Sequence, residues 1–253
     1  TMIDMHTHIL YGVDDGPKTV DETLRMLEAA KAEGITDIIS TSHASHPQYH
    51  VDFMTVNMQV AQLQKEANDI GINIHTGQEV RIQSNLIERF KNGELLTMAN
   101  SQYLLLELPS SNVPQYTKNI IYSLLEEGIT PIIAHPERNK GIAEKPERLE
   151  RLIREGALAQ VTAGSLSGHF GKSVQQLALQ LVEANLVHTY GSDVHNLTTR
   201  PFLFNEGLDY LEKKKQSDVI DVLLENNDRI LTNERMLILE PCELRKKKWR
   251  SFF

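Results

Sequence analysis

Apolar runs and amphipathic stretches alternate along this chain. The short apolar runs predict buried strands, and the longer stretches with apolar residues at helical spacing predict helices. Several helical stretches end in Gly, which accepts the left-handed conformation that stops a helix. Strands are predicted at Met2–Met5, Asp37–Ser40, Asn73–Gly77, Tyr103–Leu108, Thr130–Ala134, Ala159–Thr162 and Val187–Tyr190. Helices are predicted at Val20–Glu33, Phe53–Ile70, Asn85–Lys91, Thr117–Glu127, Pro146–Glu155, Val174–Ala184, Phe202–Lys214 and Asp218–Asn226.

This regular alternation is typical of an α/β protein in which parallel strands are covered by helices. It predicts a closed or nearly closed barrel in a single domain. An open, doubly wound sheet is the alternative, but its usual glycine-rich nucleotide motif is absent after the first strand. No shift in composition marks a second domain, so we expect the barrel to occupy residues 1–240 and a tail to occupy residues 241–253.

Length and composition fit that architecture. The chain has 253 residues, with 40% hydrophobic and 24% charged residues, and one α/β barrel usually needs roughly 250 residues. No run approaches the roughly 18 apolar residues that cross a bilayer, and the first strand begins too early for a signal peptide. The single cysteine, Cys242, excludes an internal disulfide and fits a reducing compartment, so we expect a cytoplasmic protein.

Charge is distributed unevenly. The net charge of −8 argues against a general nucleic-acid binder, which would present a basic face. One basic block, Arg245 to Arg250, is followed by Phe252 and Phe253. This basic and aromatic tail is either a solvated terminus or a contact with an anionic membrane surface or an acidic partner.

Two histidines end the first predicted strand. Residues i and i+2 of a strand point to the same side, so His6 and His8 project together from the strand end. Two imidazoles placed in this way can bind one divalent metal ion, as in many hydrolases. Taken alone, the pair also fits two ordinary polar residues. Residues elsewhere in the chain are needed to distinguish a metal site from this alternative.

Further metal-binding residue types follow the other strands. In a parallel barrel the carboxyl ends of all strands gather at one face, where active sites form. One of the acids, Glu107, lies inside a run of leucines, where a charge is expensive unless a cation pairs with it. The stretches that end on this face carry His6 and His8, Asp14 and Asp15, His43, Glu79, Glu107, His135 to Arg138, and Asp193 to His195. A metal site at the mouth of the barrel is therefore predicted.

Other residues near these candidates have simpler explanations. Asp4 and Asp14 neighbour these candidates and are expected to be structural residues, and so is Glu137. His46 and His50 belong to a polar loop that can border the site, although we expect the loop to face water.

The ordered set of motifs resembles the polymerase and histidinol phosphatase (PHP) superfamily. The motifs span the chain from Ile3 to His195, and further pieces are similar to its bacterial protein-tyrosine phosphatase branch, the CpsB/YwqE type. Those pieces are Val13–Pro17, Ser40–His43, Gly128–His135 and Ser192–Leu197, with Arg200 and Pro201 beyond, and the Bacillus-type enzyme is the nearest pattern. The resemblance implies a distorted (β/α)7 TIM-like barrel that holds three metal ions, often manganese.

Carried over by position, the resemblance implies three sets of ligands. The first ion would be bound by His6, His8, Glu79 and Asp193; the second by Glu79, Glu107 and His135; and the third by Asp15, His43 and His195. Asp15 and Glu107 stand where many superfamily members have His. The larger share of carboxylates favours Mn²⁺ over Zn²⁺, with Fe, Zn or Mg as alternatives.

The resulting hypothesis is metal-dependent phosphate-ester hydrolysis by metal-activated hydroxide. Arg138 and Arg200 are assigned to phosphate binding because guanidinium groups match phosphate geometry; surface solvation is the alternative. A proton donor for the leaving group is left open between His195 and a metal-bound water. Because the phenolate of tyrosine leaves readily, with a pKa of about 10, little acid assistance is required.

The resemblance implies a phosphatase of phosphotyrosine in proteins, whose partner is a bacterial tyrosine kinase with a tyrosine-rich tail, in the control of capsule or exopolysaccharide synthesis. The alternatives are a small-molecule phosphomonoesterase of the histidinol-phosphatase type, a nuclease, and a non-catalytic binding module. A cysteine-based mechanism is excluded because Cys242 has Lys248, and not Arg, six residues later. The sequence does not reveal the oligomeric state.

Overall fold

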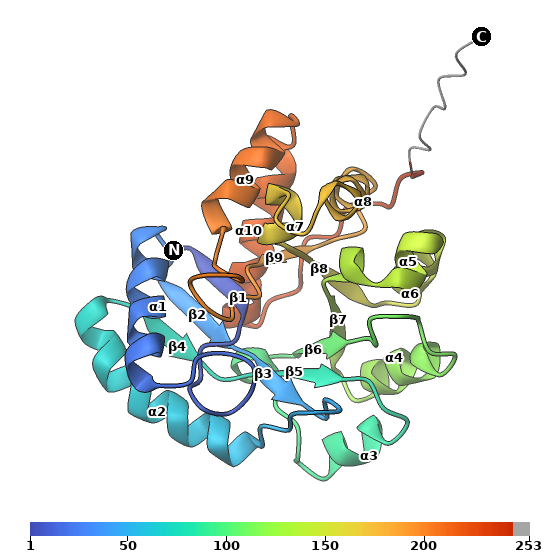
Figure 1. Cartoon of the computed structure of the whole chain (residues 1–253). Coiled ribbons are helices and arrows are strands. Elements are labelled where there is room, and N and C mark those ends of the chain that lie inside the picture. Colours follow the sequence, from blue (N-terminus) through green and yellow to red (C-terminus); the bar gives the residue numbers. More distant parts are fainter. Residues whose placement is uncertain (245–253) are drawn as a thin grey trace.

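The strands form the inner wall of the molecule, and the helices lie outside them. In this computed structural model residues 1–244 are described (Figure 1). The strands within them are β1 (Ile3–Thr7), β2 (Asp37–Ser40), β3 (Ser42–Ala44), β4 (Asn73–His75), β5 (Gln78–Arg81), β6 (Tyr103–Glu107), β7 (Thr130–Ala134), β8 (Leu158–Thr162) and β9 (Thr189–Gly191). The helices are α1 (Val20–Ala32), α2 (Phe53–Ile70), α3 (Leu86–Lys91), α4 (Thr117–Glu126), α5 (Lys140–Glu144), α6 (Glu147–Arg154), α7 (Ala163–Ser167), α8 (Lys172–Glu183), α9 (Phe204–Lys213) and α10 (Ser217–Thr232), with short 3₁₀ turns η1 (Met98–Asn100) and η2 (Pro136–Arg138).

All the strand pairings are parallel. One sheet has the order β1-β2-β4 and the other the order β3-β5-β6-β7-β8-β9. One residue separates β2 from β3, and two residues separate β4 from β5. Each pair is therefore one interrupted strand that joins the two sheets. A parallel bridge between Thr7 and Val194 connects β1 to the segment after β9. The predicted seven-stranded α/β barrel is confirmed, and its distortion consists of these interruptions.

The inside of the barrel changes from apolar to polar along the strand direction. Side chains at alternate positions of a strand share a face, and the parallel register places Glu79 opposite Leu105 and Arg81 opposite Glu107. Leu105 belongs to a buried cluster at the start of the barrel, whereas Glu107, two residues later, reaches the mouth. The apolar layer closes one end of the barrel, and the other end is left to polar side chains.

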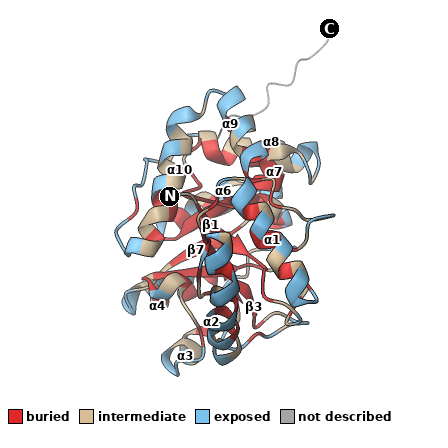
Figure 2. Ribbon diagram, turned by 90° about the vertical axis from the view of Figure 1, so that its left-hand side faces the viewer, coloured by how far each residue is buried: buried red, intermediate tan, exposed pale blue. Residues whose placement is uncertain are grey.

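The larger hydrophobic core lies between the strands and the surrounding helices. Figure 2 shows buried strands in the centre and helices whose outer faces are exposed. Leu104 and Leu106 of β6 belong to this core, and so do Leu63 of α2 and Leu181 of α8. The apolar positions that predicted helices from the sequence are therefore the positions that pack on the barrel.

Several elements differ from the prediction. Helices α5 and α7 were not predicted, because each has only five residues and shows too little periodicity to be detected. Helix α10 continues to Thr232, beyond the predicted end at Asn226. The buried Asn226 and Asn227 side chains donate hydrogen bonds to carbonyl oxygens of His188 and Tyr190, so tertiary contacts outweigh their weak helix propensity.

Two further structural findings bear on the sequence analysis. No helix within residues 1–244 is long and apolar enough to cross a membrane. The basic and aromatic block from Arg245 onward lies outside the described residues, so both the role of the tail and the division at residue 240 stay predictions.

Candidate metal centre and phosphate pocket

The carboxyl ends of the strands bring all nine predicted metal ligands to one face. Within residues 1–244 they form overlapping groups in which one ligand atom per residue lies within 4.8 Å of the others. The groups are His6, His8, Glu79 and Asp193; Glu79, Glu107 and His135; and His8, Asp15, His43 and His195, with a further group of His43, His46 and Glu107. The first two match the predicted sets, and the third adds His8 to its set.

The first group has the spacing of ligands around one ion. His6 Nε2 lies 3.1 Å from Asp193 Oδ1, and His8 Nε2 lies 3.1 Å from Glu79 Oε1. The two Nε2 atoms are 3.4 Å apart. Ligand atoms at about 2.1 Å from one ion lie about 3.0–3.4 Å apart for bond angles between 90° and 109°. The four side chains are therefore placed as a ligand set and not as independent ion pairs.

The second group shares Glu79 with the first. While Glu79 Oε1 faces His6 and His8, its Oε2 lies 3.1 Å from His135 Nε2. Glu107 Oε2 lies 3.6 Å from the same nitrogen, and Glu107 Oε1 is 2.9 Å from Arg81 Nε. The two oxygens of Glu79 thus point into two adjacent groups, as a bridging carboxylate requires.

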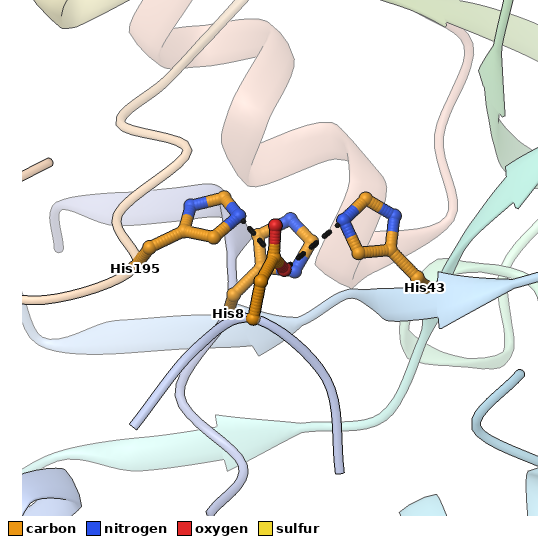
Figure 3. A group of neighbouring side chains, drawn as sticks. His8, His43 and His195 are labelled. Carbon is orange, nitrogen blue, oxygen red and sulfur yellow. Dashed lines mark ion pairs between the residues drawn. The ribbon is translucent and has the colours of Figure 1, made fainter. Parts of the chain in front are cut away.

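The third group is centred on Asp15. Its Oδ1 lies 3.3 Å from both His43 Nε2 and His195 Nε2. Figure 3 shows the rings of His43 and His195 on either side of the ring of His8. The His8 and His195 rings are nearly parallel, with centroids 4.0 Å apart.

Buried atoms without hydrogen-bond partners show that a cation fits these groups. Each such atom is costly in a folded protein unless something compensates it. In the described part of the chain they include Glu79 Oε1 and Asp193 Oδ1 in the first group, and Asp15 Oδ1 and His195 Nε2 in the third. His43 Nδ1 is another, and it faces Glu79 Oε1 at 3.4 Å. Carboxylate oxygens and imidazole nitrogens that lack donors but face one another are the donor set of a divalent metal.

Two buried side chains orient the first histidines. His6 Nδ1 lies 2.8 Å from Gln160 Oε1, and His8 Nδ1 lies 3.1 Å from Asp14 Oδ2. Each acceptor holds a proton on Nδ1, so that in the neutral ring the lone pair of Nε2 faces the carboxylates. Asp14 also accepts hydrogen bonds from the backbone N–H groups of Gly16 and His43, so it ties the loop after β1 to β3 beside the ligands.

The backbone is unusual at the ligand positions. His135 has φ of 34° and Asp193 has φ of 55°, in the left-handed region that non-glycine residues seldom adopt. A Cβ atom on Gly16 would lie 2.7 Å from the carbonyl oxygen of His8, and one on Gly191 would lie 2.9 Å from the Cβ of His6. The glycines let two ligand-bearing loops approach β1 closely.

In the metal-free protein several histidines and carboxylates of the cluster shift one another's pKa values toward the charged forms. Burial by itself lowers the pKa of His6, but the charges of Asp193 and Glu79 raise it to about 10. Burial also lowers the pKa of His135, whereas hydrogen bonds to Glu107 and Glu79 raise it to about 9. Burial raises the pKa values of Glu79 and Asp193. The positive charge of His6 and contacts with neighbouring histidines lower them by more, so both pKa values lie well below the usual range.

Two arginines converge on one oxygen of Asp193. Arg138 Nη1 lies 2.7 Å and Arg200 Nη2 lies 2.9 Å from Asp193 Oδ2. The Arg138 guanidinium also lies over the ring of Phe170, 4.4 Å from its centroid. Both arginines line a pocket of about 190 Å³ together with seven of the predicted ligands. The position predicted for them, at the mouth of the barrel, is therefore observed, and phosphate binding stays a prediction.

Three residues of the site were missed by the sequence analysis. Gln160 lies inside β8 and carries no metal-binding signal, Arg81 follows Glu79 by two residues, and His46 was expected to face water. Arg81 and His46 both line the pocket. The spacing of Arg81 from Glu79 was an available signal, because both side chains share one face of β5.

Sequence comparison gives related proteins along nearly the whole chain. The family model described as "Capsular polysaccharide synthesis, CpsB/CapC" matches residues 2–232. CapC of Staphylococcus aureus is 40% identical over 251 residues, with 98% of each chain covered. The tyrosine-protein phosphatase YwqE of Bacillus subtilis is 38% identical over 254 residues, with 100% of each chain covered.

Structural comparison agrees with the sequence. A crystal structure from work on YwqE of Bacillus subtilis and CpsB of Streptococcus pneumoniae, described as unique metal-dependent tyrosine phosphatases, superposes with a TM-score of 0.93. It is 38% identical and covers 97% of this chain and 100% of that chain. A lactonase from Listeria monocytogenes, at 11% identity and a TM-score of 0.57 over 92% of this chain and 95% of that chain, shares the fold alone.

Proposed function

The chain belongs to the CpsB/CapC family of capsular polysaccharide synthesis, and we propose that it is a metal-dependent phosphatase that hydrolyses phosphotyrosine in proteins. The observation that carries this proposal is Asp193, whose Oδ1 faces the histidines while its Oδ2 accepts from two arginines. The proposed metal ligands and the proposed phosphate-binding arginines therefore lie on the two sides of one carboxylate. Metal-dependent hydrolysis of a phosphate ester uses both a metal ion and cationic donors near the phosphoryl group.

Three divalent ions are proposed, one for each ligand group. His6, His8, Glu79 and Asp193 would hold the first; Glu79, Glu107 and His135 the second; and Asp15, His43 and His195, beside His8, the third. Mn²⁺ is the ion we expect, because oxygen ligands make up about half of the set; Fe, Zn and Mg are the alternatives for the assay. Such ions supply Lewis acidity, which makes water a competent nucleophile near neutral pH and neutralises phosphoryl oxygens.

The residues of the chain bind and orient the ester. Arg138 and Arg200 offer planar guanidinium donors to phosphoryl oxygens, where charge is concentrated during transfer. Their shared contact with Asp193 fixes both guanidinium groups at the edge of the pocket before substrate arrives. Arg81, which lines the same pocket and bonds Glu107, keeps that carboxylate aligned with His135.

His195 is proposed as a metal ligand and not as a proton donor. Its Nδ1 donates to the backbone oxygen of Asp193 at 2.7 Å, and its Nε2 faces Asp15. One ring nitrogen of His195 is therefore held by the backbone, and the other faces the third group. A phenolate leaving group, with a pKa of about 10, needs no dedicated acid from the chain.

The proposed substrates are tyrosine-phosphorylated proteins of the cytoplasm. We expect a bacterial tyrosine kinase with a tyrosine-rich tail to be among them, in the control of capsule or exopolysaccharide synthesis. The single cysteine, exposed Cys242, supports a reducing compartment. Contact of the basic and aromatic tail with a membrane is part of the same proposal and concerns residues outside the described range.

The test is hydrolysis by metal-stripped protein to which Mn²⁺, Mg²⁺ or Zn²⁺ is added back. A phosphotyrosine peptide, a phosphoserine peptide and histidinol phosphate are compared as substrates. Metal-restored release from the phosphotyrosine peptide alone is expected, and release only from histidinol phosphate would move the chain to the small-molecule alternative. His135→Ala should abolish turnover, whereas His75→Ala, at a half-buried histidine that pairs with Asp37, should retain it.

A further inference from the structure

Three rings form a continuous strip at one side of the pocket. The His43 and His46 ring centroids are 4.6 Å apart, and Tyr49 lies 5.5 Å from His46. Tyr49 is also nearly parallel to His43, with an interplanar angle of 18° and centroids 6.1 Å apart. We call His43, His46 and Tyr49 the aromatic strip.

The aromatic strip leads from the metal centre to the surface. His43 is a buried member of the third ligand group, His46 is half-buried and lines the pocket, and Tyr49 is half-buried beyond it. Among residues 1–244 the Tyr49 hydroxyl has no hydrogen-bond partner, and the aromatic rings that its ring pairs with are those of His43 and His46. The outer part of the strip therefore keeps an aromatic face available beside the pocket opening.

The loop that carries the aromatic strip is fixed by its own hydrogen bonds. The backbone N–H of Ser45 donates to His50 Nδ1, and that of Gln48 donates to His46 Nδ1, each at 3.1 Å. Gln83 Nε2 donates to the carbonyl oxygen of Ser45 at 3.0 Å. A preformed aromatic surface loses little freedom when a ligand ring packs against it.

We propose that the aromatic strip is the subsite for the phenyl ring of phosphotyrosine, a proposal that rests on the function given above. With the phosphoryl group between the ligand groups and the arginines, the ring bonded to it must lie against the pocket rim. Aromatic rings favour offset or edge contacts with one another. A serine side chain has no ring, so the aromatic strip adds affinity only for aryl esters.

Other residues around the pocket offer fewer aromatic contacts to the phenyl ring of a substrate. Ser110 and Asn139, which also line the pocket, have polar side chains without a ring. Phe170 is the other aromatic residue near the arginines, but one of its faces already holds the Arg138 guanidinium. His46 lines the pocket and Tyr49 lies next to it, so this side presents adjacent aromatic rings to a ligand.

The test measures binding to the Mn²⁺-loaded protein by calorimetry with two matched ligands, phenylphosphonate and methylphosphonate. These ligands share the phosphonate group and differ in the ring, and neither is hydrolysed. In Tyr49→Ala the Kd for phenylphosphonate should rise about 3- to 10-fold, the factor expected for one aromatic contact, while the Kd for methylphosphonate changes less than twofold. Tyr49→Phe should retain the wild-type preference.

Tyr122→Ala is the matched control, because Tyr122 is an exposed tyrosine on α4; it should change neither Kd. An unchanged preference in Tyr49→Ala, or an equal loss for both ligands, would overturn the subsite. Turnover of a phosphotyrosine peptide by the wild-type protein is measured separately. Absent turnover with an intact, Tyr49-dependent ring preference would refute the proposed function and leave the subsite standing.

Discussion

The imidazole of His6 and the side-chain amide of Gln160 meet inside the barrel, with His6 Nδ1 2.8 Å from Gln160 Oε1. The amide nitrogen of Gln160 donates to Val161 O and Thr162 Oγ1, which fixes the amide orientation. The oxygen that faces His6 can only accept, so His6 Nδ1 carries a proton whether the ring is charged or neutral. Loss of the second ring proton then leaves the lone pair of Nε2 directed at Glu79 and Asp193. A neutral residue with no metal-binding chemistry thereby sets the state of a predicted ligand.

Gln160→Met keeps the side-chain length and removes this acceptor. We expect Mn²⁺ affinity to fall about 10- to 100-fold, the usual effect of losing a partner that orients a ligand. Calorimetric titration of metal-stripped protein measures it. Gln175→Met, at a half-buried glutamine that bonds Leu166 on α7, should bind metal like the wild type, and equal affinities in the two variants would contradict the role of Gln160.

Asp14→Asn tests the equivalent partner of His8. The amide can still accept from one backbone N–H, but it lacks the charge that holds the His8 proton on Nδ1. Metal content after dialysis against limiting Mn²⁺ should fall below that of the wild type. The exposed Asp21 of α1 provides the control Asp21→Asn, and a full metal complement in both proteins would argue against orientation by Asp14.

Arg138→Lys and Arg200→Lys should lower kcat/KM for a phosphotyrosine peptide by about 10²- to 10³-fold each, because an ammonium group cannot donate bidentately to a phosphoryl group. Metal content should remain close to the wild-type value. Arg154→Lys, at a surface arginine paired with Glu150, serves as the control. If the two pocket variants retained wild-type kcat/KM, phosphate binding by these arginines would be wrong.

Metal binding should release protons. The metal-free protein holds His6 with a pKa of about 10 and His135 with a pKa of about 9, so both are protonated at pH 8 and must lose a proton to bind a metal. Mn²⁺ affinity should therefore rise with pH through about 9 and level off above about 10. Titrations in buffers of different ionisation enthalpy count the protons, and a heat that does not depend on the buffer would contradict these protonation states.

Gly16→Ala should destabilise the protein by about 1–3 kcal/mol, because the new methyl group would overlap the carbonyl oxygen of His8. Thermal unfolding measures the loss, and Mn²⁺ binding should weaken as Asp15 is displaced. Gly93→Ala is a useful comparison, since Gly93 has φ of 74° and open space around it. Its cost, about 1–2 kcal/mol for a side chain in the left-handed conformation, should leave metal binding intact.

The fold was predictable because its signals are local. Short apolar runs, helical periodicity and glycine after helices each depend on neighbouring residues, and they located β6 and β7 to within one residue. The five-residue helices α5 and α7 and the last turns of α10 were not predictable in this way. Their stability comes from contacts with distant segments, as in the bond from Asn227 to the carbonyl oxygen of Ile3.

The sequence by itself determined which residues reach the mouth of the barrel. Parallel strands end at one face, so His6, His43, Glu79, Glu107 and His135 had to converge there once the strands were identified. That rule needs only chain order and strand direction. It does not need the register between strands.

Only the tertiary structure decided which side chains meet. The pairing of Arg81 with Glu107 depends on the register of β5 and β6, and the contact of His6 with Gln160 joins strands that are 154 residues apart in the chain. The aromatic strip depends on a loop closed by its own hydrogen bonds. A shift of one residue in any of these registers would turn the side chains to the opposite face, which is why the partners were fixed by packing and not by sequence pattern.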